Sequence, residues 1–255
     1  MSVGIRSGLV GFRQGLKEGY HSLRAPTIFD KDCVLFLPLN TLSNRKTFDL
    51  SGYGNHGTVY GAVLRDFGEE YYLKFKGKLA RVGGKGFYFD GIDNYISCGS
   101  DESLNITGDI TIEMVFNSED YKSRDQFFLH MGQGAHSGYW ILSWGGSLIF
   151  GRGNGESYAE ICFSVDENKY IFLTCVFRTG KGAVYVNGMM KRPWTSMSYQ
   201  PPSSVPVYIA SGSGWYMTYP DNFKGLVGLV RIYKRALSPR EIKEHFELER
   251  VLFGV

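Results

Sequence analysis

The chain has 255 residues, of which 43% are hydrophobic, enough for one large domain with its own core. Aromatic residues make up 15% of the sequence and there are 33 glycines, a mixture typical of many short strands joined by tight turns. The formal net charge is only +3, and no run of lysine or arginine is long enough to follow a phosphate backbone, which argues against a nucleic-acid partner.

The sequence predicts neither a transmembrane segment nor an export signal. No stretch approaches the roughly 20 apolar residues that a helix needs to cross a bilayer. Near the N-terminus, Arg6, Arg13, Lys17 and Glu18 interrupt the apolar run that a secretory signal requires. We therefore expect the chain as given to be made and used without conventional export.

The first 30 residues differ from the rest and are predicted to be a glycine-rich docking arm, residues 1–30, ahead of a single domain, residues 31–255. Glycines at positions 4, 8, 11, 15 and 19 form one stripe of a helix, and each costs about 0.5 to 1 kcal/mol relative to alanine. Beside it runs an apolar stripe with helical spacing: Ile5, Leu9, Phe12, Leu16, Tyr20 and Leu23.

A helix so rich in glycine needs a partner surface close to its backbone. We therefore expect residues 1–25 to dock on another copy of the chain or on another particle or surface protein. A disordered arm and an interfacial membrane helix remain as alternatives. The spacing leaves open whether the arm is helical or extended.

Four cysteines are present, but they lack the CxxC spacing of a zinc site, so we expect buried thiols on strands: Cys33, Cys98, Cys162 and Cys175. Cys162 and Cys175 flank a predicted turn at residues 166–169 and would pair across a hairpin only in an oxidising compartment. Spacing alone leaves that open. The five histidines are dispersed and have no cysteine or acidic partner at metal-ligand spacing.

Strands are predicted through most of the chain. Alternating apolar residues indicate strands at residues 34–39, 110–116, 126–131, 139–144, 147–151, 159–164, 171–178, 183–186, 207–210 and 226–233. Asn187 and Gly188 favour a two-residue type I′ hairpin turn. Ser238, Pro239 and Glu241 have the spacing of a capping box, which predicts a short helix whose apolar positions Ile242 and Phe246 rest on a sheet.

Four blocks in a fixed order carry a family resemblance. They are Asp49-x-Ser51-Gly52-x-Gly54-Asn55-x-Gly57, then Phe89-Asp90-Gly91-x-Asp93-x-Tyr95, then residues 183–188, and finally residues 225–242. Together they resemble the laminin-G-like jelly-roll domain of the concanavalin A-like lectin/glucanase superfamily over residues 33–248, least clearly at residues 65–85 and 191–205. The resemblance implies an all-β fold, a two-sheet antiparallel jelly-roll sandwich with an N-terminal helical or extended arm and a short C-terminal helix.

Glycoside hydrolases share this superfamily, so one strand needs to be tested as a catalytic site. Asp109, Thr111 and Glu113 alternate and share one face of their strand. The glucanase signature is Glu-x-Asp-x-Glu, and here threonine replaces the middle acid while the first acid is shortened. We therefore predict a protein that is not an enzyme, with no catalytic residues.

The resemblance also implies a structural calcium, because related domains often hold one with oxygen ligands from the opening turn and a late strand. Asp49, Asn55, Asp90 and Asp93 supply oxygens of the right type. Gly228 stands where family members often carry an aspartate in the late strand. The alternative is that Asp49 and Asp90 cap turns through their own backbone, and no cofactor is required in that case.

The best candidate for a ligand-binding site is the loop at residues 214–222, which mixes flat aromatic rings with polar groups. The residues predicted to bind are Trp215, Tyr216, Tyr219, Asp221, Asn222 and Trp194. Contact with another subunit and local packing are alternatives. We expect Tyr139, Trp140 and Trp144 to pack in the core or on a sheet face.

The expected function is that of a non-enzymatic recognition protein with a lectin-like domain that binds glycan or protein. We predict a virion or phage-particle component, because such a protein is assembled in the host cytoplasm and later displays its lectin-like face outside. The alternatives are a cellular adhesin or surface carbohydrate-binding module and a divergent glycoside hydrolase. The corresponding locations are the virion and the cell surface.

Overall fold

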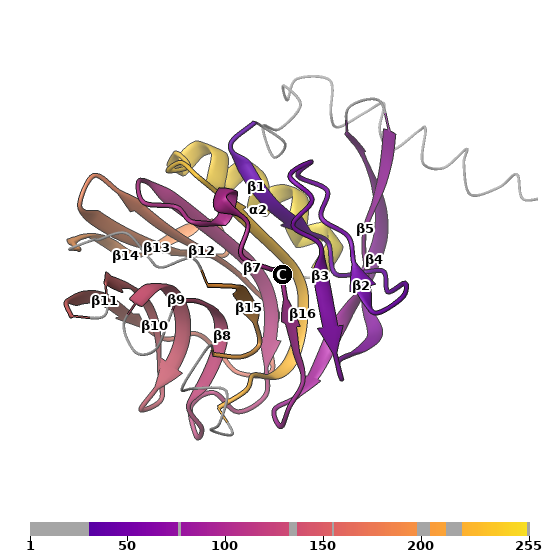
Figure 1. Cartoon of the computed structure of the whole chain (residues 1–255), viewed down its shortest axis with the longest axis horizontal. Coiled ribbons are helices and arrows are strands. Elements are labelled where there is room, and N and C mark those ends of the chain that lie inside the picture. The colour runs from indigo at the N-terminus through magenta and orange to yellow at the C-terminus, as the bar shows by residue number, and fades with distance from the viewer. Residues whose placement is uncertain are drawn as a thin grey trace, which may run out of the picture.

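A computed structural model describes residues 31–75, 78–132, 137–154, 156–197, 205–212 and 221–253. These residues form two eight-stranded antiparallel sheets and one α-helix, so the predicted all-β jelly-roll sandwich is confirmed (Figure 1). The predicted arm, residues 1–30, lies outside the described residues, and its boundary with the domain stays a prediction. None of the described helices is long and apolar enough to span a bilayer.

Sheet A takes strands from both halves of the chain. Its order is β14 (Met189–Ser196), β13 (Lys181–Val186), β12 (Ile171–Arg178), β7 (Ile110–Ser118), β16 (Lys224–Tyr233), β5 (Lys78–Asp90) and β4 (Val63–Phe75), and β1 (Cys33–Leu37) also pairs with β16.

Sheet B faces sheet A across the main core. Its order is β11 (Tyr158–Phe163), β10 (Ser147–Asn154), β9 (Ser137–Trp144), β8 (Gln126–Met131), β15 (Val207–Ile209), β6 (Tyr95–Ser97), β3 (Gly57–Tyr60) and β2 (Lys46–Thr47), and a short 3-10 helix, η2 (Glu102–Leu104), follows β6.

Strand β7 shows how the sequence builds two cores at once. Ile110, Ile112 and Met114 alternate into the core between the sheets, whereas Val115 on the opposite face joins a second core. In β16 a bulge between Val227 and Leu229 shifts the register by one residue.

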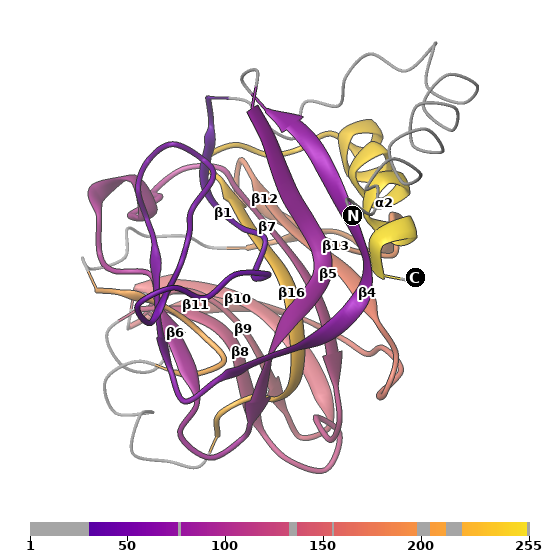
Figure 2. The same ribbon diagram turned by 90° about the vertical axis from the view of Figure 1, so that its right-hand side faces the viewer.

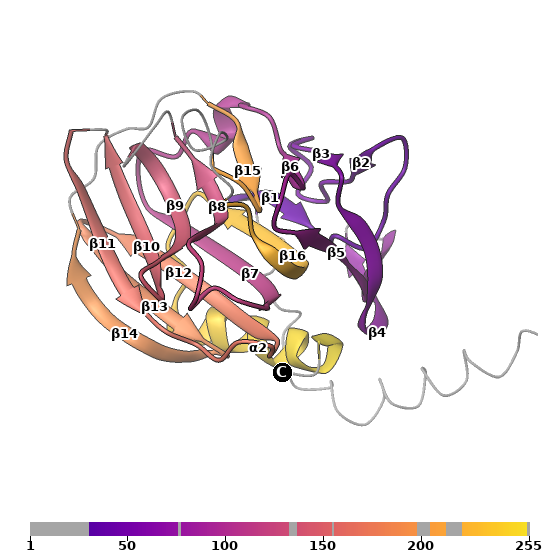
Figure 3. The same ribbon diagram turned by 90° about the horizontal axis from the view of Figure 1, so that it is seen from below.

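The second core lies between the outer face of sheet A and α2 (Pro239–Phe253) (Figure 3). Phe36, Phe172 and Tyr233 from the sheet meet Ile242 of the helix there, and all four side chains are buried. The predicted capping box is confirmed, since Glu241 N–H donates to Ser238 Oγ and Ser238 N–H donates to Glu241 Oε2. The helix is longer than the short one predicted.

The region that resembled the family least is a long hairpin. Strands β4 and β5 pair from Val63 opposite Tyr88 to Phe75 opposite Lys78, and Figure 2 shows this hairpin running beside α2. Phe67 of β4 is buried in the second core, so the hairpin, which is itself part of sheet A, contributes to that core.

The prediction of buried thiols is confirmed for Cys33, Cys98 and Cys175 and is wrong for Cys162, which is exposed. All four cysteines are free. Cys162 lies on β11 of sheet B and Cys175 on β12 of sheet A, because the chain crosses between sheets at the turn once expected to close a hairpin. Burial raises the pKa of the Cys175 thiol well above its usual value, which keeps that thiol protonated.

Candidate functional site

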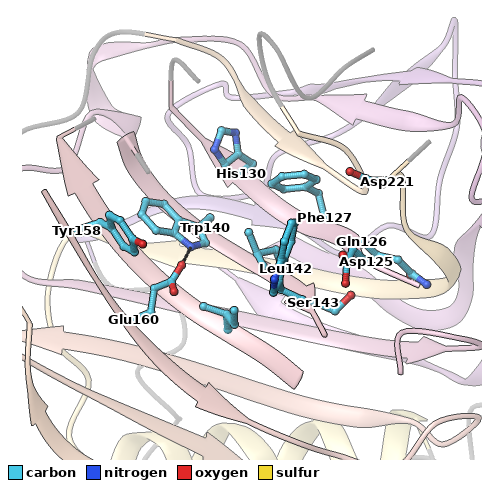
Figure 4. A pocket seen from close by; sticks show the side chains of 12 residues that line it. Asp125, Gln126, Phe127, His130, Trp140, Leu142, Ser143, Tyr158, Glu160 and Asp221 are labelled. Carbon is cyan, nitrogen blue, oxygen red and sulfur yellow. Dashed lines mark hydrogen bonds between the residues drawn. The ribbon is translucent and has the colours of Figure 1, made fainter. Parts of the chain in front are cut away.

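The outer face of sheet B carries a groove across strands β8 to β11, with a volume of about 340 Å³ (Figure 4). No described helix covers this face, whereas α2 covers the matching face of sheet A. The two sheets therefore have different outer surfaces, and the outer face of sheet B is open where the groove crosses it.

One row of residues crosses the floor of the groove. His130 of β8 lies opposite Trp140 of β9, Trp140 lies opposite Gly151 of β10, and Gly151 lies opposite Glu160 of β11. A Cβ atom on Gly151 would stand 2.1 Å from Cε2 of the Trp140 ring. Because position 151 lacks a side chain, the indole lies across β10 and donates from Nε1 to Glu160 Oε1 at 3.3 Å.

The neighbouring row is apolar. Phe127 lies opposite Leu142, and Leu142 lies opposite Ile149, and all three side chains line the groove. A bulge in β8 between Phe127 and Leu129 puts Phe127 and His130 on the same face although they are three residues apart. The floor is thus a largely apolar surface with polar groups at its ends, as small-molecule sites usually are.

Each end of the groove has an exposed aromatic side chain. Trp144 at the end of β9 is 65% exposed, and Tyr158 at the start of β11 is 47% exposed. Both residues lie opposite positions on β10, Trp144 opposite Ser147 and Tyr158 opposite Gly153. At about 3.3 Å per residue, these two positions on β10 are roughly 20 Å apart. Trp140 is buried and contacts the Tyr158 ring at 6.3 Å between centroids, so it supports the floor.

Carboxylates stand beside both exposed rings. Glu160 lies near Tyr158, while Asp125 and Asp221 line the groove at the Trp144 end, where Asp125 Oδ1 accepts from Gly145 N–H at 2.9 Å. Burial and the charge of Asp125 raise the pKa of Asp221, and the nearby Arg124 only partly opposes them. Carboxylates beside aromatic faces are suited to accept hydrogen bonds from hydroxyl or amine groups.

His130 contributes an uncharged ring to the groove. It is 1% exposed, and burial lowers its pKa to about 4, so it is neutral at pH 7. Its ring meets Phe127 edge-on at 5.4 Å between centroids.

The structure places the predicted binding residues in three settings. Asp221 lines the groove. Asn222 is buried and donates from Nδ2 to Ile92 O at 2.9 Å, which ties the segment before β16 to the turn before β6. Trp194 packs at the edge of the second core under Arg178, 4.8 Å from its ring, on sheet A and away from the groove. Trp215, Tyr216 and Tyr219 lie outside the described residues.

The four residues predicted to hold calcium lie at two separate places. Asp49 accepts hydrogen bonds from Phe36 N, Ser51 N and Oγ, Gly54 N and Asn55 N. Asp90 Oδ1 accepts from Ile92 N and closes a turn, and Asp93 is exposed. Phe36 pairs with Arg231 and Asp90 with Lys224, seven residues apart on β16, or roughly 23 Å.

These four side chains therefore do not fit one shared calcium ion, and Asp49 and Asp90 serve as turn caps. The described residues contain no group of three or more His, Cys, Asp or Glu side chains placed to hold a metal. That the chain binds a structural calcium stays a prediction.

Glu113 is wholly buried beneath α2. Its carboxylate lies 3.0 Å from His245 Nδ1 and 2.9 Å from Arg231 Nε, and Arg231 Nη1 lies 2.9 Å from Glu249 Oε1. All four side chains are 0% exposed. Asp109, at the start of the same predicted face, accepts from Thr179 N–H. Glu113 therefore has no route to a substrate.

Sequence reasoning missed most of the groove. Trp140 and Trp144 were expected only to pack, and Phe127, His130, Tyr158 and Glu160 were not considered as site residues. One signal in the sequence could have located the groove. Tyr158, Glu160 and Cys162 alternate along one strand, and glycines stand at positions 151 and 153 around the end of the strand before it, a pattern that indicates an open outer face.

A two-sheet jelly roll with an aromatic groove on an open sheet face defines the class of lectin-like binding domains. The sequence profile of the concanavalin A-like lectin/glucanases superfamily matches residues 90–243. The chain belongs to this superfamily, and the predicted resemblance is confirmed. A comparison with curated proteins found no match.

Among the solved structures with a similar fold are the binding domains of a botulinum neurotoxin and of a mosquitocidal protein. The binding domain of botulinum neurotoxin DC in complex with SialylT is 18% identical, with a TM-score of 0.59, and the match covers 85% of this chain and 51% of that one. The binding domain of Paraclostridial mosquitocidal protein 1 is 16% identical, with a TM-score of 0.59 and coverage of 84% and 52%.

A third structure is the botulinum neurotoxin DC binding domain in complex with rat synaptotagmin II, which is 16% identical with a TM-score of 0.58 and coverage of 86% and 52%. The chain thus spans about half the length of these structures. At such low identity the likeness shows the fold alone.

Proposed function

We propose that the protein is a non-enzymatic lectin-like protein that binds an oligosaccharide along the groove of sheet B. The observation that carries the proposal is the pairing of an exposed aromatic ring with carboxylates at each end of the groove, Trp144 with Asp125 and Asp221, and Tyr158 with Glu160. Aromatic faces bury the apolar side of a sugar ring at little entropic cost, and carboxylates accept its hydroxyl protons.

The length of the groove favours an extended ligand. The roughly 20 Å between the strand positions of Trp144 and Tyr158 exceeds the size of a single sugar ring. The buried position of Glu113 supports a role in binding rather than hydrolysis, because the carboxylate that most resembles the glucanase signature is held inside the protein.

The test is an array of neutral, amino and acidic oligosaccharides, followed by calorimetric titration of the strongest binder. We expect Trp144→Ala and Tyr158→Ala each to weaken binding about tenfold, the effect of losing roughly 1.4 kcal/mol of contact. Met189→Ala is the matched control, since Met189 is 72% exposed on sheet A and far from the groove. No binding to any glycan, or an equal loss in the control, contradicts the proposal.

We further propose that the protein is a component of a virus or phage particle and is anchored by residues 1–25. The support is in the sequence, where the glycine stripe beside the apolar stripe is suited to close docking on another protein. Under this proposal the sandwich is displayed on the particle surface. A cellular adhesin or surface module is the alternative.

Deleting residues 1–25 separates these two possibilities. We expect the shortened chain to keep its β-sheet circular-dichroism spectrum and thermal midpoint but to be lost from purified particles. The full chain expressed in parallel is the control. Unchanged incorporation of the shortened chain removes the arm proposal.

A further inference from the structure

The charge of the groove is opposite in sign to the net charge of the chain. The chain has a net charge of +3, yet the twelve described residues that line the groove include three carboxylates and neither lysine nor arginine. The carboxylates stand at both ends, with Glu160 at one and Asp125 and Asp221 at the other (Figure 4). A ligand lying along the groove therefore meets negative charge at both ends.

Arg124, which precedes Asp125 in the chain, contacts other groups of the protein. Arg124 Nη1 donates to Gly91 O at 2.8 Å and Nη2 donates to Asn222 O at 2.9 Å, while its Nε lies 3.6 Å from Asp120 Oδ2. These contacts hold the guanidinium on backbone carbonyls outside the lining. The sequence segments 133–136 and 213–220, which adjoin groove residues along the chain, contain no lysine or arginine.

His130 does not supply a positive charge either. Because burial lowers its pKa to about 4, the ring is neutral at physiological pH. Asp221 shows the same excess of negative charge, since burial and the charge of Asp125 raise its pKa and Arg124 only partly offsets them.

We propose, building on saccharide binding in the groove, that the site discriminates by charge: it favours saccharides that carry protonated amines and rejects acidic saccharides. An ammonium group placed beside the groove carboxylates makes charge-assisted hydrogen bonds, which are about twice as strong as neutral ones. A sugar carboxylate or sulfate in the same place is desolvated without a cationic partner and is repelled. Asp125, Asp221 and Glu160 are then the residues that determine specificity.

Three matched tetrasaccharides test the charge rule on the full-length chain by isothermal titration calorimetry. The first consists of glucosamine, the second of N-acetylglucosamine and the third of galacturonic acid, titrated at a pH where the amine is protonated. We expect the amino form to bind about tenfold more tightly than the acetylated form, and the acidic form to bind weakest. The amine preference shrinks as salt is added, because exposed charges are screened.

The variants Asp125→Asn and Asp221→Asn assign the discrimination to the groove. Asparagine keeps an oxygen acceptor for Gly145 N–H at position 125, so the turn is retained. Each variant is expected to reduce the ratio of amino to acetylated affinity several-fold, because the amino form loses a charge-assisted hydrogen bond whereas the acetylated form loses only a weaker one. Asp93→Asn is the control, since Asp93 is exposed before β6 and does not line the groove.

The outcomes separate this inference from the proposed function. Tight binding of the acidic tetrasaccharide, or an amine preference that both asparagine variants retain, overturns the charge rule and leaves saccharide binding intact. If no tetrasaccharide binds and the glycan array is also blank, saccharide binding itself fails. Thermal midpoints of the variants exclude unfolding as the cause of any loss.

Discussion

Two carboxylates beneath α2 differ in what they contribute to stability. Burial alone would raise the pKa of Glu113, but His245 and Arg231 outweigh burial and hold that pKa below its usual value. Burial raises the pKa of Glu249, and the charge of Glu113 raises it further. The charge of Arg231 lowers this pKa but does not offset the rise. Glu113 therefore stabilises the fold when ionised, whereas ionised Glu249 opposes it.

A pair of isosteric substitutions tests this difference. At pH 7, Glu113→Gln leaves Arg231 and His245 without their main partner and is expected to lower the free energy of unfolding by about 3 kcal/mol or more. Glu249→Gln removes a charge that burial disfavours, so the change is expected to stay within about 1 kcal/mol. Urea unfolding measures both. Equal losses would contradict the assignment.

The directions of the pKa shifts of Glu113 and Glu249 determine how each carboxylate changes stability with pH. Because the pKa of Glu113 is lowered in the folded state, its contribution is present above the unfolded pKa, about 4.3, and is lost as the pH falls through the folded value. The raised pKa of Glu249 acts in the opposite sense, since its contribution is present at low pH and is lost as the pH rises. The difference in the free energy of unfolding between the two variants is therefore expected to be smaller at pH 4 than at pH 7.

At the scale of single elements, the sequence was sufficient to predict turns and helix caps, because the residues that determine them are only a few positions apart. Asn187 and Gly188 both have positive φ, 50° and 72°, as the predicted type I′ turn between β13 and β14 requires. The capping box at Ser238 and Glu241 depends on residues three apart and was also predictable. Such elements are determined by their local sequence.

Long-range partners limited the prediction of the helix face. The spacing of Ile242 and Phe246 located the side of α2 that faces the sheet, but His245 and Glu249 on that side were not expected to be buried. Their partners, Glu113 and Arg231, come from β7 and β16, and Glu113 is 132 residues from His245. Only the register of sheet A brings these charges together.

The groove was unpredictable for a related reason. Phe127 and His130 share a face only because β8 is bulged, and strict alternation would have put them on opposite faces. The row of Trp140, Gly151 and Glu160 exists only in the register of three strands. Among the residues predicted to bind, Asp221 alone is described in the groove.

At the scale of the whole molecule, the arrangement of layers determines which surface is free. The chain places α2 on the outer face of sheet A, where it packs on a core that includes Phe36 and Phe67. Sheet B keeps its outer face open between Trp144 and Tyr158. The family resemblance predicted the two sheets, whereas the unequal covering of their outer faces follows from tertiary packing.

The stability of the whole molecule is expected to fall in two steps as the pH decreases. Burial holds the pKa of His130 at about 4, below the ordinary value of about 6.5. The unfolded chain therefore binds a proton at this position before the folded one does, and up to about 3 kcal/mol of stability is lost between pH 6.5 and pH 4. Glu241 acts in a lower range, since hydrogen bonds from Arg235 and Ser238 outweigh burial and hold its pKa at about 2.

Urea unfolding of the full chain at intervals from pH 8 to pH 2 measures both steps. In His130→Gln the free energy of unfolding is expected to stay nearly level from pH 6.5 to pH 4, with the lower step retained. In Glu241→Gln the upper step is retained, while the decline from about pH 4.3 towards pH 2 becomes shallower because the carboxylate that binds Arg235 and caps α2 is gone. An unchanged slope above pH 4 in His130→Gln would show that the ring in the groove is not held neutral by burial.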